Sequence, residues 1–206
     1  MGHKVSALDL DLRQRTFGRY SDNRQSFLKD SGLDLPSPHC HELPEVDPST
    51  LSPGENIYDH RLSAAVADLE PNNDFILIDC PPSLNLLTVN AMVASHSVLV
   101  PLQSEFFALE GLSQLMLTVR EVRQTANPDL RIEGVVLTMF DARNNLSQQV
   151  ENDARENLGE MVFKTKIPRN VRVSEAPSFA LPVLDYDPAS KGAQAYNELA
   201  REVIEK

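Results

Sequence analysis

Asp9, Asp11 and Asp79 are the residues whose type and position point most directly to chemistry. Asp9 and Asp11 close a short apolar run that begins at Val5. Residues two apart on a strand point the same way, so both carboxylates would face one crevice where the strand ends. Such a pair can hold a metal-bound water or position the water that attacks a phosphate. A helix cap and a surface acid would explain the same two residues.

Asp79 ends a second apolar run, FILID (Phe75–Asp79), which is the Walker B pattern. In that role the carboxylate orients Mg²⁺, usually through water, beside the phosphates of a nucleotide. Many α/β strands end in an Asp that only caps the next turn, and the motif alone does not separate the two roles. Two strand-end acid sites in one chain together favour a crevice for phosphate and magnesium.

The sequence contains no phosphate-binding loop of the form G-x-x-x-x-G-K-[ST]. In such a loop, backbone N–H groups and the Lys hold the β- and γ-phosphates. The eight glycines are widely spaced, and none is followed by Lys. G-x-G-x-x-G is absent as well, so a dehydrogenase has no support in the sequence.

The run His39-Cys40-His41-Glu42 consists of residue types that bind metals. Adjacent residues rarely converge on one ion, and no second ligand pair follows at a suitable spacing. We therefore expect no metal site there. Cys80 has no nucleophile–base pattern around it and is expected to be a small buried residue of the core. Two cysteines in the whole chain suit a reducing compartment.

The elements that would position the acids alternate between strands and helices. Buried strands read as short apolar runs, and helices show apolar residues at helical spacing. This order predicts a doubly wound α/β fold with a mostly parallel sheet, in a single domain over residues 1–206. Strands are predicted at 5–10, 75–79, 97–101, 134–139 and 162–167, a short extended piece at 182–184, helices at 14–29, 57–69, 84–94, 108–125, 146–157 and 189–205, and a proline-rich loop at 33–54.

Composition narrows the class of protein. No run of about 18 apolar residues exists, so no membrane span is expected, and the N-terminus lacks the features of a secretory signal. We expect a soluble, cytoplasmic chain. The net charge of −11 argues against a surface that binds nucleic acid throughout. Basic residues gather in two places, where a local basic face or a solvated surface with nearby counter-charges is expected: Arg13, Arg15, Arg19 and Arg24, then Lys164, Lys166, Arg169 and Arg172.

Residues 74–206 closely resemble ParA/Soj partitioning ATPases, members of the deviant-Walker superfamily that also contains MinD. The resemblance implies a P-loop NTPase-like fold of the SIMIBI type. The segments that carry it keep their order along the chain: DFILIDCPPSLNLLTVNA, VPLQSEFFALEGLSQL, GVVLTMFDARNNLSQQV, IPRNVRVSEAPSF and YDPASKGAQAY.

Residues 1–35 resemble a different branch of the superfamily. LDLDLRQRTFGRYSDNR (Leu8–Arg24) is similar to MipZ, a division-site regulator, where Soj-type proteins read DLDPQGN. The two resemblances meet at FILID, which suits either branch. A natural hybrid, a gene-model artefact and an engineered splice would each produce this pattern.

The resemblance implies roles for the strand-end acids. Asp11 would position water for ATP hydrolysis, with Asp9 beside it near the magnesium. Asp79 would be the Walker B carboxylate, and it would hold Mg²⁺ through water together with Asp11. ATP and Mg²⁺ are therefore the implied cofactors.

Further roles follow for the C-terminal half. Pro168, Arg169 and Asn170 lie where the family packs the adenine ring, and Met139 ends the strand beside them. Arg169, Arg172 and Lys191 lie at positions where Soj-type dimers carry basic residues that bind DNA without sequence preference. Arg169 and Arg172 could instead pair with Glu175 or Asp187.

The chain departs from the family at the phosphate-binding loop, which has the form KGGxGK[ST]. That loop is absent here with its strand and its helix, so we expect the fold without its first strand, P-loop and first helix. Loss of the phosphate cradle should remove most catalysis and normal ATP binding. Loss of a central strand should also expose apolar edges.

Three functions remain open. The first is a ParA/Soj-type ATPase for chromosome or plasmid segregation, which dimerises on ATP, binds nucleoid DNA without sequence preference and responds to a ParB-like partner. The second is a MipZ-like division-site regulator that uses the same chemistry. The third is a catalytically inactive ParA-like binding module.

Overall fold

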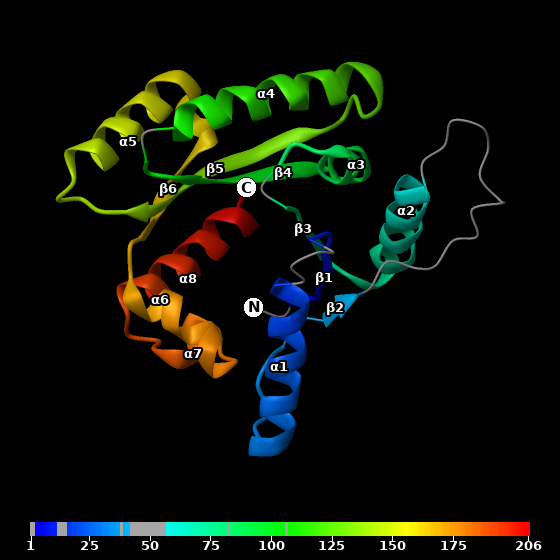
Figure 1. Cartoon of the computed structure of the whole chain (residues 1–206), viewed down its shortest axis with the longest axis vertical. Coiled ribbons are helices and arrows are strands. Elements are labelled where there is room, and N and C mark those ends of the chain that lie inside the picture. The colour runs from blue at the N-terminus through cyan, green and yellow to red at the C-terminus, as the bar shows by residue number, and fades with distance from the viewer. Residues whose placement is uncertain (1–2, 12–15, 38, 42–56, 82, 106) are drawn as a thin grey trace. The chain divides into compact units, whose positions relative to one another are not determined.

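The chain has two compact units, Met1–Ser95 and His96–Lys206, each with its own parallel sheet. The computed structural model describes residues 3–11, 16–37, 39–41, 57–81, 83–105 and 107–206 (Figure 1). Within these ranges no helix is both long and apolar enough to cross a membrane. We call the two parts the N-terminal unit and the C-terminal unit.

The N-terminal unit is a three-stranded parallel sheet with the order β2-β1-β3. Val5 of β1 lies opposite Phe75 of β3, and the register continues to Asp9 opposite Asp79. Its elements are β1 (Val5–Asp9), α1 (Thr16–Ser31), β2 (His39–His41), α2 (Ile57–Leu69), the 3-10 turn η2 (Glu70–Asn72), β3 (Phe75–Asp79) and α3 (Leu86–Ala94).

The core of the N-terminal unit lies between its sheet and the helices α2 and α3. Leu8 and Leu10 are almost fully buried there with Leu62 of α2, and Ile76 and Ile78 of β3 pack against them. Each fully buried Leu contributes about 1.5–3 kcal/mol. Side chains alternate between the two faces of a strand, so Leu77 points away from this core and is 60% exposed.

The C-terminal unit is a second parallel sheet with the order β4-β5-β6. The central strand β5 pairs with β4 on one side and with β6 on the other. The elements are β4 (Ser97–Gln103), α4 (Ala108–Thr125), β5 (Arg131–Phe140), α5 (Asn145–Leu158), η3 (Gly159–Met161), β6 (Val162–Pro168), α6 (Val171–Glu175), η4 (Ala176–Phe179), α7 (Val183–Tyr186) and α8 (Lys191–Ile204).

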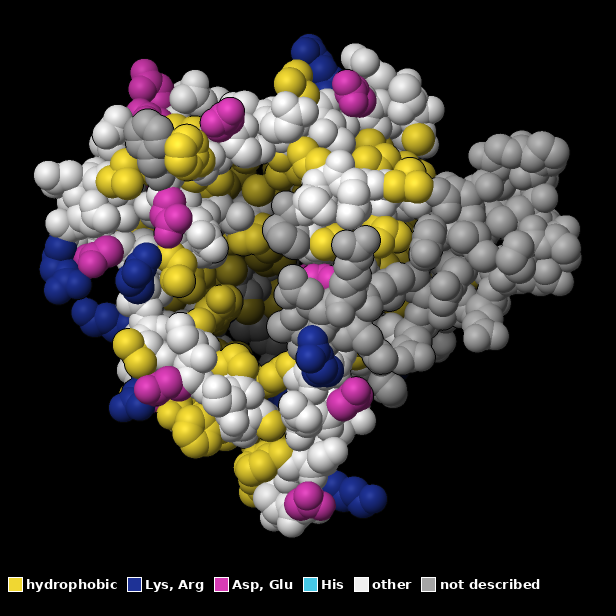
Figure 2. Space-filling model, in the orientation of Figure 1, with side chains coloured by type: hydrophobic (Ala, Val, Ile, Leu, Met, Phe, Trp, Pro, Cys, Tyr) yellow, Lys and Arg dark blue, Asp and Glu magenta, His cyan; other side chains and the backbone are white. Residues whose placement is uncertain are grey.

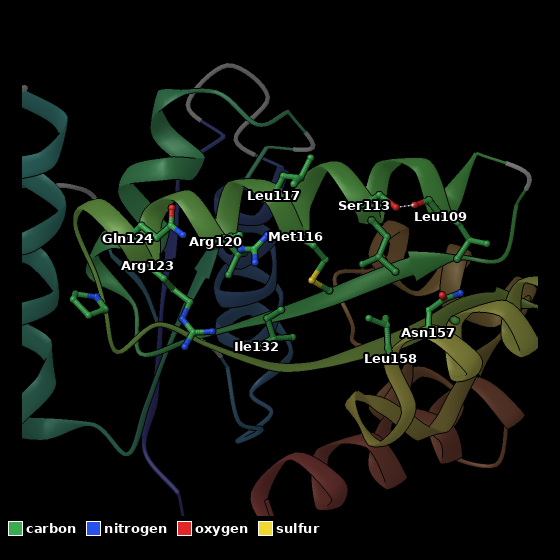
Figure 3. A pocket seen from close by; sticks show the side chains of 14 residues that line it. Leu109, Ser113, Met116, Leu117, Arg120, Arg123, Gln124, Ile132, Asn157 and Leu158 are labelled. Atoms are coloured by element: carbon green, nitrogen blue, oxygen red, sulfur yellow. Dashed lines mark hydrogen bonds between the residues drawn. The ribbon is translucent and has the colours of Figure 1, made fainter.

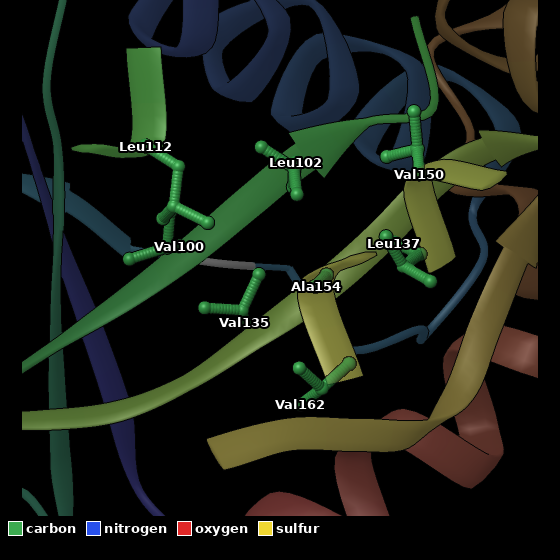
Figure 4. Packing of buried hydrophobic residues seen from close by; sticks show 8 residues of the cluster. All are labelled: Val100, Leu102, Leu112, Val135, Leu137, Val150, Ala154 and Val162. Carbon is green, nitrogen blue, oxygen red and sulfur yellow. The ribbon is translucent and has the colours of Figure 1, made fainter. Parts of the chain in front are cut away.

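Helices cover both faces of this second sheet. Val135 and Leu137 of β5 point toward α4 and α5 and form the cluster drawn in Figure 4. Val136, on the other face, packs with Phe163 and with α8. Gly134 is required beside Phe163, because a Cβ there would lie 2.4 Å from the ring. The sheet is therefore wrapped by helices on both sides, as doubly wound folds are.

The α/β fold class with parallel strands and flanking helices is confirmed. The bounds of α2, β3 and α4 are those predicted from the sequence. The single domain predicted for residues 1–206 stays a prediction, because the two units are described separately.

Three local predictions are wrong. Residues 182–184 are extended only at Pro182, because the helical turn α7 begins at Val183. The predicted loop 33–54 contains the strand β2, which pairs with β1. Three residues are too few for the sequence to indicate this pairing. Residues 42–54 lie outside the described ranges. The helix α6 was not predicted at all.

Each three-stranded sheet has two edge strands among the described residues, and β3 and β4 are one edge of each. Among the described residues, β3 has β1 as its only strand neighbour, and β4 has only β5. An edge strand presents unpaired N–H and C=O groups to whatever lies beside it. The expected absence of a central strand stays a prediction.

Candidate functional site

The three strand-end acids of the N-terminal unit lie at one edge of its sheet. Asp9 and Asp79 are register partners on the parallel strands β1 and β3, so their carboxyl ends meet at that edge. The Leu10 N–H donates to the Asp79 carbonyl at 2.8 Å and carries the pairing one residue further. Asp11 follows directly. The structure therefore brings together the acids that the sequence predicted to act together.

The Asp9 carboxylate organises the turn that follows β1. Its Oδ1 accepts from the Asp11 N–H and its Oδ2 from the Gly18 N–H, each at 2.9 Å. Gly18 lies in the first turn of α1, where backbone N–H groups have no partner within the helix. Asp9 therefore caps the helix α1, which was one of the two roles predicted for it. Its place near a magnesium stays a prediction.

Asp79 is in a position that disfavours its negative charge. Burial raises the pKa of the Asp79 carboxyl, and the negative charges of Asp9 and Asp11 raise it further. A cation beside these oxygens would relieve the repulsion, and carboxylate oxygen is the ligand that Mg²⁺ prefers. No three His, Cys, Asp or Glu side chains within the described ranges form a metal site by themselves. That Asp11 and Asp79 hold a cation through water stays a prediction.

Cys80 and His41 have contacts of a structural kind. The Cys80 thiol packs against the core of the N-terminal unit; burial raises its pKa to about 11, and the charge of Asp79 adds to the shift. The thiol is therefore protonated near neutral pH, which suits a packing residue. His41 Nε2 lies 3.2 Å from the hydroxyl of Ser6. Glu42 lies outside the described residues.

A small cavity opens at the carboxyl ends of the strands in the C-terminal unit. It has a volume of about 300 Å³, and both Met139 and Arg169 line it, as do Ser104, Glu105 and Asp141. Ligands of open α/β sheets bind outside the carboxyl ends of the strands. Two residues predicted to contact the adenine therefore share one cavity.

Met139 lies at this cavity in an unusual backbone conformation. Its φ of 53° is in the left-handed region, which few residues other than Gly adopt. Strained backbone of this kind gathers at functional sites. The next residue but one, Asp141, accepts bonds from Arg143 at 2.9 and 3.0 Å. These hydrogen bonds lower the pKa of Asp141 to about 2.

The other predicted adenine contacts lie at the same corner of the C-terminal unit. Pro168 ends β6 opposite Phe140 of β5, and the Arg169 N–H donates to the Phe140 carbonyl at 3.0 Å. The Asn170 side chain caps α6 by accepting from the Arg172 N–H at 2.8 Å. Capping fixes where this loop turns into helix, and so fixes the position of its neighbours.

The predicted DNA-binding residues differ in their partners. Arg172 pairs with Glu175 at 3.0 Å and with Asp187 at 3.3 Å, the alternative that the sequence left open. Arg169 lies 3.8 Å from Glu105. Lys191, at the start of α8, is exposed and has no ion pair among the described residues. Lysine and arginine are interspersed with acids on the face drawn in Figure 2.

One member of the first basic cluster does not lie on the predicted surface. Arg24 is 1% exposed, and its Nε donates to the Pro36 carbonyl at 3.2 Å. Its guanidinium belongs to the interior of the N-terminal unit, because α1 turns it toward the loop before β2. Arg19 is exposed, and Arg13 and Arg15 lie outside the described ranges. In the second cluster Lys164 is exposed, and Lys166 is paired with Glu151 at 2.8 Å.

The sequence argument missed Glu105 and Asp141, which line the cavity with Met139. Both follow a strand within two residues, as Asp79 ends one. The rule that polar residues just after parallel strands face the ligand crevice would have found them.

Comparison with known proteins connects both units to ATPases. The family model "ATPase MipZ" matches residues 1–161. The chromosome partitioning protein ParA of Caulobacter vibrioides is 59% identical over 149 residues, which are 71% of this chain and 56% of that protein. The sporulation initiation inhibitor protein Soj of Bacillus subtilis is 56% identical over 143 residues, 69% of this chain and 56% of Soj. The chain thus spans little more than half the length of these relatives.

Solved structures share the fold. The cell division ATPase MinD of Pyrococcus furiosus superposes with a TM-score of 0.68 at 25% identity, covering 99% of this chain and 86% of MinD. Cobyrinic acid a,c-diamide synthase of Mycobacterium smegmatis gives 0.66 at 31% identity, covering 97% and 81%. That synthase structure contains an ATP analogue and magnesium.

Proposed function

This chain belongs to the family of MipZ- and ParA/Soj-type ATPases, and on that premise we propose that it is the larger part of an ATPase that segregates chromosomes or plasmids. The observation that carries the proposal is the pairing of Asp9 opposite Asp79, with Asp11 directly after. This pairing gathers the acids of the proposed hydrolytic site at one sheet edge. Relatives named for chromosome partitioning support the cellular role.

In this proposal each acid has its own task. Asp79 and Asp11 hold Mg²⁺ through water, and their mutual repulsion with Asp9 favours a bound cation. Asp11 also positions the attacking water. Asp9 fixes the turn on which Asp11 stands through the 2.9 Å bond from the Asp11 N–H. A bound Mg²⁺–ATP would supply the phosphoryl group that is transferred to that water.

These 206 residues contain no loop of the form that holds the phosphate groups of ATP. No G-x-x-x-x-G-K-[ST] segment is present, and backbone N–H groups of such a loop are what hold the β- and γ-phosphates. We propose that tight nucleotide binding requires a phosphate-binding segment that is not among these residues. The free edges of β3 and β4 are where a further strand can pair in each sheet.

The base and the DNA would be bound by the C-terminal unit. The proposal assigns the adenine to the cavity beside Met139 and Arg169, with Pro168 and Asn170 on either side of Arg169 in the chain. Lys191, which has no ion pair among the described residues, is the favoured DNA contact, ahead of Arg169 and Arg172. The proposal includes an ATP-dependent homodimer, a ParB-like partner and action on the nucleoid in the bacterial cytoplasm.

A MipZ-like regulator of the division site is the second candidate. It is favoured by the match of the MipZ family model to residues 1–161. It uses the same acids and the same cofactors, so the two candidates differ in the cellular target. A catalytically inactive binding module is a third, supported by the absent phosphate loop. Nucleotide binding distinguishes this third candidate from the other two.

The test compares two proteins in one calorimetric titration with Mg²⁺–ATP. The first is this chain, and the second is this chain preceded by the KGGxGK[ST] strand–loop–helix of a ParA relative. We expect no specific binding by the first and binding by the second, lost in Asp79→Ala of the fused form. Asp68→Ala, on the exposed side of α2, is the matched control.

Two outcomes would reject parts of the proposal. Micromolar affinity of the unfused chain, abolished by Asp79→Ala, would show that these residues bind ATP without a separate loop. A folded fusion that binds no nucleotide would reject the ATPase and leave the inactive binding module.

A further inference from the structure

The C-terminal unit has a larger cavity, of about 920 Å³, between α4, α5 and the beginning of β5 (Figure 3). In Figure 3, Met116 points from α4 toward the sheet, where Ile132 and Leu158 line the other side. Leu117 of α4 borders the cavity and is 54% exposed. We call this surface the α4–α5 groove and define it by Met116, Leu117, Arg120, Arg123, Ile132 and Leu158.

The α4–α5 groove is separate from the candidate adenine cavity of the same unit. Ile132 stands near the beginning of β5, and Met139 stands near its end. The two cavities therefore lie toward opposite ends of this ten-residue strand. They share no lining residue. A ligand in the α4–α5 groove needs neither nucleotide nor a phosphate-binding segment.

The charge of the α4–α5 groove is opposite to that of the chain. Arg120 and Arg123 are its charged residues, and no Asp or Glu is among the residues that line it. Neither guanidinium has an ion pair with any residue that the structure describes. Arg131 and Arg201, outside the groove, also have no ion pair among the described residues. Four arginines of the same unit do have a carboxylate within 4 Å: Arg143, Arg155, Arg169 and Arg172.

We propose that the α4–α5 groove binds an acidic amphipathic helix of a partner protein. Arg120 and Arg123 are three residues apart on α4 and so lie on the same face of the helix, as do carboxylates three or four residues apart on a partner helix. Apolar side chains of that helix would cover Leu117 and enter beside Met116. Helix-in-groove recognition uses this combination of apolar anchors and flanking charges. Complementary charge also discriminates against basic partners.

The test uses two synthetic peptide probes and the whole 206-residue chain. One fluorescent peptide is a helix with leucines along one face and glutamates flanking them, and the other has lysines in place of the glutamates. Fluorescence anisotropy should show binding of the acidic peptide at least about tenfold tighter than the basic one. Its affinity should fall as salt rises.

Single charge reversals locate the site. Arg120→Glu and Arg123→Glu should each lower the affinity for the acidic peptide about tenfold or more. This is the loss of affinity that removal of one charged contact commonly produces. Arg201→Glu, on α8 and outside the groove, makes the same charge change and should leave the affinity within about twofold. Circular dichroism melts verify that each variant is folded. Leu117→Ala, which keeps all charges, should also lower the affinity for the acidic peptide.

Three results would overturn the proposal. The first is equal affinity for the acidic and basic peptides, and the second is no binding of the acidic peptide at millimolar concentration. The third is self-association, seen by sedimentation, that Leu117→Ala abolishes. That result would assign the groove to a second copy of this chain.

Discussion

Asp79 is an ionisable residue whose charge opposes folding of its own unit. Its pKa lies above the ordinary value of 3.8 because of burial first and of the Asp9 and Asp11 charges second. A pKa raised by folding means that the protonated form is favoured in the folded state. The resulting stability is fully present below the unfolded pKa and is lost as the pH rises through the folded value. At neutral pH the carboxylate is therefore a cost to stability.

We expect Asp79→Asn to raise the melting temperature of the chain at neutral pH, because the amide removes a charge that Asp9 and Asp11 repel. The gain should shrink toward pH 3, where Asp79 itself is protonated. Thermal melts by circular dichroism across this pH range measure it. Asp68→Asn removes the same charge from exposed α2. An equal gain from that control would attribute the effect to the net charge of −11 instead.

The sequence was enough to single out the acids of the candidate site. It did not predict which residues form hydrogen bonds with them. The ends of two apolar runs were enough to single out Asp9 and Asp79, since parallel strands end at one sheet edge. The capping of α1 by Asp9 depends on the bond from Gly18, nine residues further on. The burial of Arg24 depends on the carbonyl of Pro36. A local sequence pattern does not predict contacts between residues that are far apart in the chain and meet only in the folded structure.

At the scale of elements, one carboxylate joins α5 to β6. Glu151 accepts from Lys166 Nζ at 2.8 Å and from Arg155 Nε at 3.0 Å, and its side chain is 15% exposed. Burial alone would raise its pKa, but the hydrogen bonds from Lys166 and Arg155 outweigh burial and lower it. The pair of bonds thus stabilises the packing of this helix on the sheet.

We expect Glu151→Gln to reduce the free energy of unfolding by about 1.5–3 kcal/mol at neutral pH, the range for hydrogen bonds to charged groups. A lowered pKa contributes stability above the unfolded value, and this stability is lost as the pH falls through the folded value. The difference from the natural chain should therefore shrink below pH 4. Urea unfolding at several pH values measures it. Glu156→Gln, exposed on the same helix, should change little; a comparable loss there would contradict the assignment to these bonds.

Elements with a strong pattern of their own were predicted well. The apolar run of β3 and the helical spacing of α2 and α4 gave their bounds to the residue. The elements β2, α6 and α7 are each five residues or shorter and lack the continuous apolar run that marks β3. The strand β2 exists because β1 offers it hydrogen bonds, from Ser6 to Leu8. Such elements are decided by tertiary pairing.

At the scale of the whole molecule, a net charge of −11 opposes DNA binding unless the contact is local. We expect Lys191→Ala, made in the form fused to a phosphate-binding segment, to lower the salt slope of DNA affinity by about 1 per neutralised phosphate. Arg172→Ala should change the slope less, because Glu175 and Asp187 already pair with Arg172. Anisotropy of labelled duplex DNA at several salt concentrations measures both. Equal slopes for Lys191→Ala and the parent would reject the basic face.

The parallel register of the N-terminal sheet also makes β1 pair with a strand that is synthesised much later. Its β1–β3 edge joins Lys4 to Asp74, 70 residues apart, whereas the end of the β4–β5 pair joins Ser104 to Thr138, 34 residues apart. Each doubling of a loop costs about 0.6 kcal/mol in closure entropy. During synthesis at about 5–20 residues per second, β1 would wait roughly 4–14 s for β3 to emerge. Val5 to Leu10 is thus an apolar segment that stays without its partner strand for that time and is open to a ribosome-bound chaperone.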